Sequence, residues 1–116
     1  MSLKWVKIFS VGILKEKNFI KLVKVQGKKI CVVKVNEDFF AVQNHCPHAG
    51  AELSQGFCSD KKLICSHHRY EYDLETGRGK EGQGDYLTTY TIKITHDGIY
   101  LGFKEKWIFF KKLFGV

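Results

Sequence analysis

Two short clusters of cysteine and histidine constrain this chain more than any other feature of its sequence. The first is Cys46-Pro47-His48 and the second is Cys65-Ser66-His67-His68, with sixteen residues between His48 and Cys65. As C-x-H followed by C-x-x-H, the clusters offer two thiolates and two imidazoles from Cys46, His48, Cys65 and His68. One sulfur and one nitrogen on each of two loops suits a two-iron, two-sulfide cluster, in which one iron takes both cysteines and the other both histidines.

The same residues leave two alternatives open. A structural zinc module also uses two cysteines and two histidines, although the spacing here is unlike that of common zinc fingers. His67 is a second conceivable nitrogen ligand, because Cys65-Ser66-His67 is itself a C-x-H arrangement. His45 and His96 have no partner by spacing and are expected at the surface.

The stretches around the clusters are CPHAGAELSQG (residues 46–56) and CSHHRYEYDLETG (residues 65–77). They resemble a Rieske-type iron–sulfur protein, in particular a small soluble Rieske ferredoxin. The resemblance implies one 2Fe-2S cluster with Cys46, His48, Cys65 and His68 as ligands, and the family spacing selects His68 over His67. It also implies that His48 and His68 lie at a solvent-facing tip, where electrons leave.

Several positions depart from the family pattern. Arg69 stands where the family usually has Gly, and His67 where it often has Trp. The loop that normally covers the cluster is proline-rich, whereas residues 77–85 have four glycines and no proline, which predicts a softer cover. Respiratory-chain relatives carry a disulfide between the ligand loops, but Ala51 and His67 occupy those positions here, so that disulfide cannot form.

Tyr72 is a candidate for tuning the cluster. In high-potential relatives a Ser and a Tyr after the last ligand donate hydrogen bonds to the sulfurs, and Tyr70 and Tyr72 occupy the matching positions. Tyr70 lacks the short reach of a serine hydroxyl. A Tyr72 phenol that donates to the Cys46 sulfur would raise the potential. The alternative is an ordinary strand aromatic whose hydroxyl bonds to backbone or water.

The rest of the chain predicts an all-β fold. Short runs rich in Val, Ile and Phe alternate with turn residues, as in hairpins. We expect a single Rieske domain over residues 1–103, a β-sandwich or barrel base with a cluster-binding subdomain at about 44–75, and a basic aromatic tail at 104–116. The apolar segment Trp5–Leu14 is predicted to be a strand rather than a signal peptide.

The four cysteines do not have the spacing of a small disulfide-rich secreted scaffold. Cys31 lies in an apolar run and is predicted to be a small buried hydrophobe, whereas Cys58 has no assigned role. A disulfide between Cys31 and Cys58 is disfavoured in a cytosolic protein, and the cytoplasm is the expected location.

The formal charge of +7 is unevenly distributed. Residues 1–44 carry +6, residues 45–85 carry −2 and residues 86–116 carry +3. Diffuse lysines make nucleic acid an unexpected partner, and they form either a solvated sheet face or a docking surface for an acidic partner. The tail either packs on the sheet or makes peripheral membrane contact. The sequence has no run of 18 apolar residues, so no transmembrane segment is expected.

These features predict an electron-transfer protein rather than an enzyme, with no catalytic residue of its own. It would pass single electrons from a reductase to an oxygenase or similar terminal enzyme. The small subunit of a nitrite reductase is an alternative, because it shares the fold. That subunit often lacks some cluster ligands, and the presence of all four here argues against it.

Overall fold

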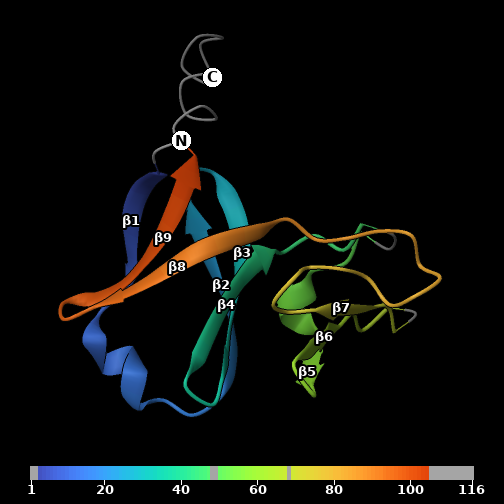
Figure 1. The fold of residues 1–116 in the computed structure, drawn as a ribbon, viewed down its shortest axis with the longest axis horizontal. Coiled ribbons are helices and arrows are strands. Elements are labelled where there is room, and N and C mark those ends of the chain that lie inside the picture. Colours follow the sequence, from blue (N-terminus) through green and yellow to red (C-terminus); the bar gives the residue numbers. More distant parts are fainter. Residues whose placement is uncertain (1–2, 48–49, 68, 105–116) are drawn as a thin grey trace, which may run out of the picture.

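Antiparallel strands form almost all of the regular structure, which confirms the expected all-β class (Figure 1). The computed structural model describes residues 3–47, 50–67 and 69–104. In these ranges, β1, β9, β8, β4, β3 and β2 form one curled sheet in that order, and β5, β6 and β7 form a second. The bounds are β1 Leu3–Phe9, β2 Phe19–Val25, β3 Lys28–Val35, β4 Asp38–Gln43, β5 Phe57–Ser59, β6 Lys62–Ile64, β7 Glu71–Asp73, β8 Thr89–Thr95 and β9 Gly98–Lys104, with short 3-10 helices η1 Val11–Lys15 and η2 Leu53–Gln55.

Local turn chemistry explains the hairpins. Gln26 and Gly27 join β2 to β3 with φ of 51° and 79°, and Asp60 and Lys61 join β5 to β6 with φ of 53° and 59°. Two-residue loops with positive φ at both positions match the right-handed twist of the strands that they connect. The register of each hairpin therefore follows from its turn.

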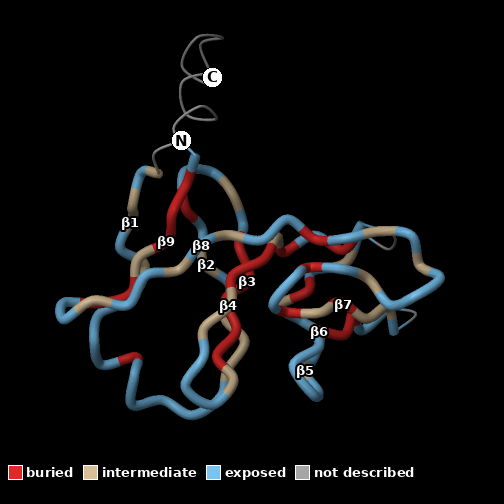
Figure 2. Tube along the Cα trace, in the orientation of Figure 1, coloured by how far each residue is buried: buried red, intermediate tan, exposed pale blue. Residues whose placement is uncertain are grey.

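Strand β3 is buried on both faces and joins the two parts of the core. Ile30 and Val32 belong to a cluster enclosed by the six-stranded sheet, while Cys31 and Val33 belong to a cluster shared with the second sheet. Figure 2 shows this continuous buried stretch along β3. A strand covered on both faces has a run of apolar residues rather than an alternating pattern.

The second sheet lies within an insertion, residues 44–88, between β4 and β8. The chain leaves the six-stranded sheet after Gln43 and rejoins it where Thr89 and Tyr90 pair with Val42 and Ala41. The insertion extends to one side of the base sheet (Figure 1). This arrangement confirms the expected insertion between strands of a β base, and cluster binding by the insertion stays a prediction.

The segment Trp5–Leu14 is not one strand, so that prediction was wrong. Strand β1 ends at Phe9, and η1 follows it. Lys34 is only 6% exposed, and its Nζ donates to the carbonyl oxygens of Leu14 at 3.1 Å and Glu16 at 2.5 Å. This buried amine stabilises the turn of the segment. Its acceptors lie 18 and 20 residues away in the sequence, so a local sequence pattern cannot reveal the contact.

Strand β8 begins at Thr89, because the preceding residues belong to the insertion. Within the described ranges, no helix has the length and apolar character needed to span a bilayer. The tail after Lys104 lies outside the described residues, so its expected packing or membrane contact stays a prediction.

Candidate metal centre

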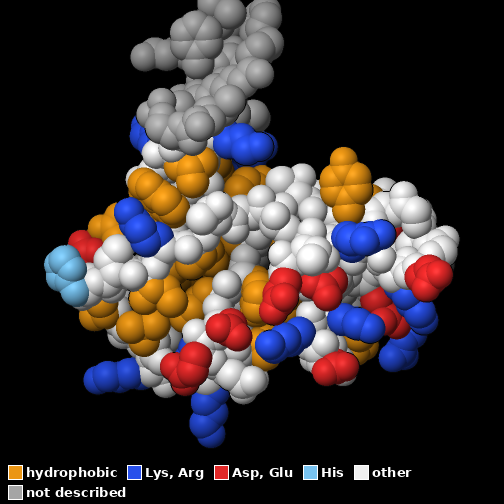
Figure 3. Space-filling model, viewed as in Figure 1, with side chains coloured by type: hydrophobic (Ala, Val, Ile, Leu, Met, Phe, Trp, Pro, Cys, Tyr) orange, Lys and Arg blue, Asp and Glu red, His pale blue; other side chains and the backbone are white. Residues whose placement is uncertain are grey.

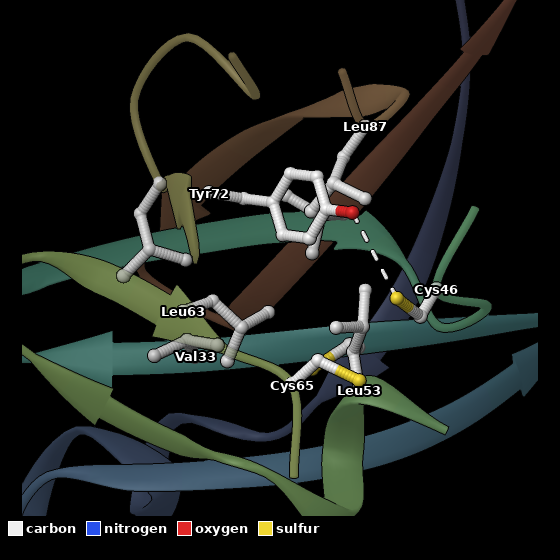
Figure 4. Packing of buried hydrophobic residues seen from close by; sticks show 10 residues of the cluster. Val33, Cys46, Leu53, Leu63, Cys65, Tyr72 and Leu87 are labelled. Carbon is white, nitrogen blue, oxygen red and sulfur yellow. Dashed lines mark hydrogen bonds between the residues drawn. The ribbon is translucent and has the colours of Figure 1, made fainter. Parts of the chain in front are cut away.

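Cys46 and Cys65 meet in the buried core of the insertion. Both side chains are fully buried, Cys46 after β4 and Cys65 directly after β6. They share an apolar cluster with Leu53, Leu63 and Leu87 (Figure 4). Burial raises the pKa of the Cys65 thiol, and the neighbouring Cys46 thiol raises it further. Two sequence-predicted ligands that lie nineteen residues apart are therefore brought together.

A buried asparagine organises the first ligand loop. Asn44 is 3% exposed, its Nδ2 donates to Glu52 Oε1 at 3.2 Å, and its Oδ1 accepts from the Ser54 backbone N–H at 2.9 Å. The Cys46 backbone N–H donates to the Ala51 carbonyl at 2.9 Å. Sequence analysis did not single out Asn44, although an asparagine at the end of a strand is a known turn signal.

The second ligand loop closes with a hydrogen bond from the Cys65 backbone N–H to the Tyr70 carbonyl, at 2.8 Å. Arg69 has φ of 56°, in the left-handed region that favours glycine, at the position where the family usually has Gly. Its guanidinium carbon lies 5.7 Å from the centre of the Phe57 ring. The departure at Arg69 thus keeps the loop conformation that glycine would favour.

The histidines are only partly placed. His48 and His68 lie outside the described residues. His67 is exposed, and its backbone N–H donates to the Cys65 sulfur, which acts to lower the pKa of that thiol. Across the described ranges, no three His, Cys, Asp or Glu side chains are grouped to hold a metal ion, so His67 does not join Cys46 and Cys65 in such a group. His45 and His96 are exposed, as expected.

The Tyr72 phenol lies beside Cys46, the first predicted ligand. Tyr72 is fully buried, and its oxygen is 3.7 Å from Cys46 Sγ, a contact in which either atom can donate (Figure 4). The same hydroxyl donates to Asp85 Oδ2 at 2.6 Å. Burial raises the pKa of Tyr72, and the Asp85 carboxylate raises it further. The partner of the phenol is thus a carboxylate, which neither interpretation of the sequence anticipated.

Asp85 belongs to the cover loop, residues 77–85, which side chains tie to β7. Gln83 Nε2 donates to Asp85 Oδ1 at 3.1 Å, and Gln83 Oε1 accepts from the Glu71 backbone N–H at 2.9 Å. The Gly79 backbone N–H donates to the Asp85 carbonyl at 2.9 Å. This network orders the loop in a way that its glycine content and lack of proline do not predict.

Cys31 and Cys58, the other two cysteines, lie close enough to interact electrostatically and form no disulfide. Burial raises the pKa of Cys31 to about 12, and the nearby Cys58 contributes a smaller part of that rise. Cys31 is fully buried, so the prediction of a small buried hydrophobe is confirmed. Cys58 lies on β5 and packs against the same cluster as Cys46 and Cys65.

The described residues fit an iron–sulfur cluster. Two thiols converge in an apolar environment, and a backbone N–H already donates to one of the sulfurs. Metal coordination deprotonates such thiols and overcomes the pKa increase that burial causes. Apolar burial and N–H donors to sulfur are features that tune a cluster of this kind.

Comparison with known proteins agrees with this fit. The model of the Rieske [2Fe-2S] domain family matches residues 4–90. The chain therefore belongs to the Rieske 2Fe-2S domain family, whose fold and cofactor the resemblance had indicated.

Several known proteins are similar to this chain over most of its length. The chain is 28% identical over 95 residues to the ferredoxin component of a naphthalene 1,2-dioxygenase system from Pseudomonas aeruginosa. That alignment covers 81% of this chain and 90% of the ferredoxin component. The ferredoxin of carbazole 1,9a-dioxygenase from Nocardioides aromaticivorans superposes with a TM-score of 0.74 at 22% identity, over 84% of this chain and 96% of that one. A putative NADH-dependent nitrite reductase small subunit from Mycobacterium tuberculosis superposes with a TM-score of 0.78 at 17% identity. The superposition covers 88% of this chain and 96% of that one. The two structural likenesses show the fold alone.

Proposed function

We propose that this protein is a Rieske ferredoxin, a one-electron carrier between a reductase and an oxygenase or similar terminal enzyme. The observation that carries the proposal is the pair of fully buried thiols, Cys46 and Cys65, in a chain of the Rieske family. Relatives that match most of the chain are ferredoxin components of dioxygenase systems, and they are electron carriers rather than catalysts.

We assign Cys46 and Cys65 to one iron and His48 and His68 to the other. A 2Fe-2S cluster held by this set would take up and release one electron. The cysteine thiolates balance ferric charge whereas neutral imidazoles do not, so this ligand set gives a higher potential than four cysteines. The role of the protein is to hold both thiolates in an apolar core while the histidine side remains available to a partner.

The test is cluster content. The purified protein should contain two irons and two labile sulfides per chain, show the visible absorption of a Rieske cluster, and give its EPR signal after reduction. Cys46→Ser and Cys65→Ser should each abolish that absorption, because each removes one thiolate from a shared iron. His67→Ala is the matched control, and it should keep the full spectrum. Normal absorption in either serine variant would refute the ligand assignment.

The small subunit of a nitrite reductase is a second candidate, because the Mycobacterium tuberculosis protein shares the fold. The presence of all four ligand positions in this sequence argues against it. A chain that stays iron-free when it is produced with ample iron and sulfide would support this candidate and contradict a ferredoxin. A colourless protein that holds one zinc ion would instead support a structural zinc module.

We place the protein in the cytoplasm, because its four cysteines lack the spacing of a disulfide-rich secreted scaffold. On the face in Figure 3, many Asp and Glu side chains lie over the insertion, among Lys and Arg. Lysines outside the insertion carry most of the positive charge of the chain. Such a distribution suits electrostatic steering of redox partners.

A further inference from the structure

The Tyr72 hydroxyl has one proton and two neighbours that can accept it. Asp85 Oδ2 lies 2.6 Å from the phenol oxygen, and Cys46 Sγ lies 3.7 Å from it. A phenol can donate only one hydrogen bond, and a carboxylate is a strong, charge-assisted acceptor. The phenol therefore donates to Asp85 Oδ2, the nearer acceptor, and has no second proton to donate to the sulfur.

We propose that Asp85 is a positioning residue that holds the Tyr72 proton away from the Cys46 sulfur and so keeps the reduction potential of the cluster low. A hydrogen bond to a ligand sulfur stabilises the reduced form, which carries one more negative charge, and therefore raises the potential. The inference rests on the proposed function, because it concerns a cluster bound through Cys46. Under it, Tyr72 occupies the tuning position without exerting the tuning effect.

Asp85 is itself fixed for this task. Its Oδ1 accepts from Gln83 Nε2 at 3.1 Å, which leaves Oδ2 to Tyr72. A Cβ built on Gly79 would lie 2.5 Å from Asp85 Oδ1, so glycine at that position makes room for the carboxylate. A carboxylate held from both sides cannot swing away from the phenol without loss of these contacts. The cover loop thus sets the direction of one hydrogen bond in the core.

A double-mutant cycle tests the proposal. The midpoint potential is measured by EPR-monitored titration for the wild type, Asp85→Asn, Tyr72→Phe and the double variant. Asp85→Asn weakens the acceptor, so the phenol turns to the sulfur and the potential should rise. Tyr72→Phe alone should leave the potential nearly unchanged, and in its background Asp85→Asn should have a much smaller effect. Asp85→Ala removes the acceptor entirely and serves as the second variant if Asp85→Asn does not fold.

Two controls separate the alternatives. Glu81→Gln removes an exposed charge from the same loop, so it measures the through-space effect of one charge. Gln83→Ala removes the bond to the Glu71 backbone and the bond to Asp85 Oδ1, so it loosens the loop while the direct bond from Tyr72 to Asp85 Oδ2 remains. Both should shift the potential far less than Asp85→Asn does.

Three outcomes would overturn the proposal. An equal effect of Asp85→Asn with and without the phenol would mean that only its charge acts. A clear fall of the potential in Tyr72→Phe would mean that the phenol already donates to the sulfur. A Gln83→Ala shift as large as that of Asp85→Asn would assign the effect to loop order. Each of these requires a wild type with a Rieske EPR signal, whereas absence of that signal would refute the proposed function instead.

Discussion

Gly77 is a position where the structure predicts a large cost for one added methyl group. It has φ of 79°, and a Cβ there would lie 2.4 Å from the Leu87 carbonyl oxygen, which belongs to the backbone. Gly77→Ala therefore adds left-handed strain of about 1.5 kcal/mol and a backbone displacement of about 2 kcal/mol. The reduced freedom of the unfolded chain offsets about 0.7 kcal/mol. We expect a net loss of about 3 kcal/mol in the free energy of unfolding.

Gly84→Ala is the matched control, because Gly84 has φ of 75° but nothing within 4 Å of the position that the added methyl group would occupy. It should cost only the strain less the offset, about 1 kcal/mol. At about 4 °C per kcal/mol, the thermal midpoints of the two cluster-loaded variants should differ by about 8 °C in circular dichroism at one heating rate. Equal midpoints would refute the assignment of the cost to the Leu87 carbonyl.

Three further predictions concern stability and partner docking. Lys34→Met should lower the free energy of unfolding by about 2 kcal/mol, measured as a fall in thermal midpoint, since it removes two hydrogen bonds from a buried charged donor; an unchanged midpoint would contradict this. Arg69→Gly should change the free energy of unfolding by less than about 0.5 kcal/mol, because relief of strain is offset by a more flexible unfolded chain and by loss of the Phe57 contact. A larger shift of the thermal midpoint would argue against that balance. Electron transfer to the partner should slow as salt rises, since exposed charges are screened beyond about 10 Å at 0.1 M, and neutralising lysines in residues 1–44 should weaken this dependence without moving the potential; a rate indifferent to salt would favour an apolar contact.

The hairpins and the two candidate ligand cysteines could be identified from the sequence because their signals are local. Gln26-Gly27 between two apolar runs determines a turn, and the turn determines the register of its strands. The spacing of Cys46 and Cys65 within the family motif likewise identifies both thiols without knowledge of the path between them. The structure confirms that these thiols meet in one buried cluster.

The contacts that the sequence did not predict join segments that local patterns cannot relate. The η1 turn depends on Lys34, which lies 18 and 20 residues from its two acceptors. The Tyr72–Asp85 bond depends on the path of a glycine-rich loop, and glycine permits many paths. In each case a polar group is buried against one specific partner, and the identity of that partner depends on tertiary structure.

The cover loop shows how loop order and redox tuning can share one group. A proline-rich cover would be stiffened by its own rings, whereas this loop depends on hydrogen bonds that converge on Asp85. The same carboxylate that anchors the loop also accepts the hydrogen bond of the Tyr72 hydroxyl. A substitution that softens the loop by removing Asp85 must therefore also free the phenol, so loop order and potential should change together at Asp85 but separately at Gln83. That difference between two neighbouring residues makes the proposed role of Asp85 measurable.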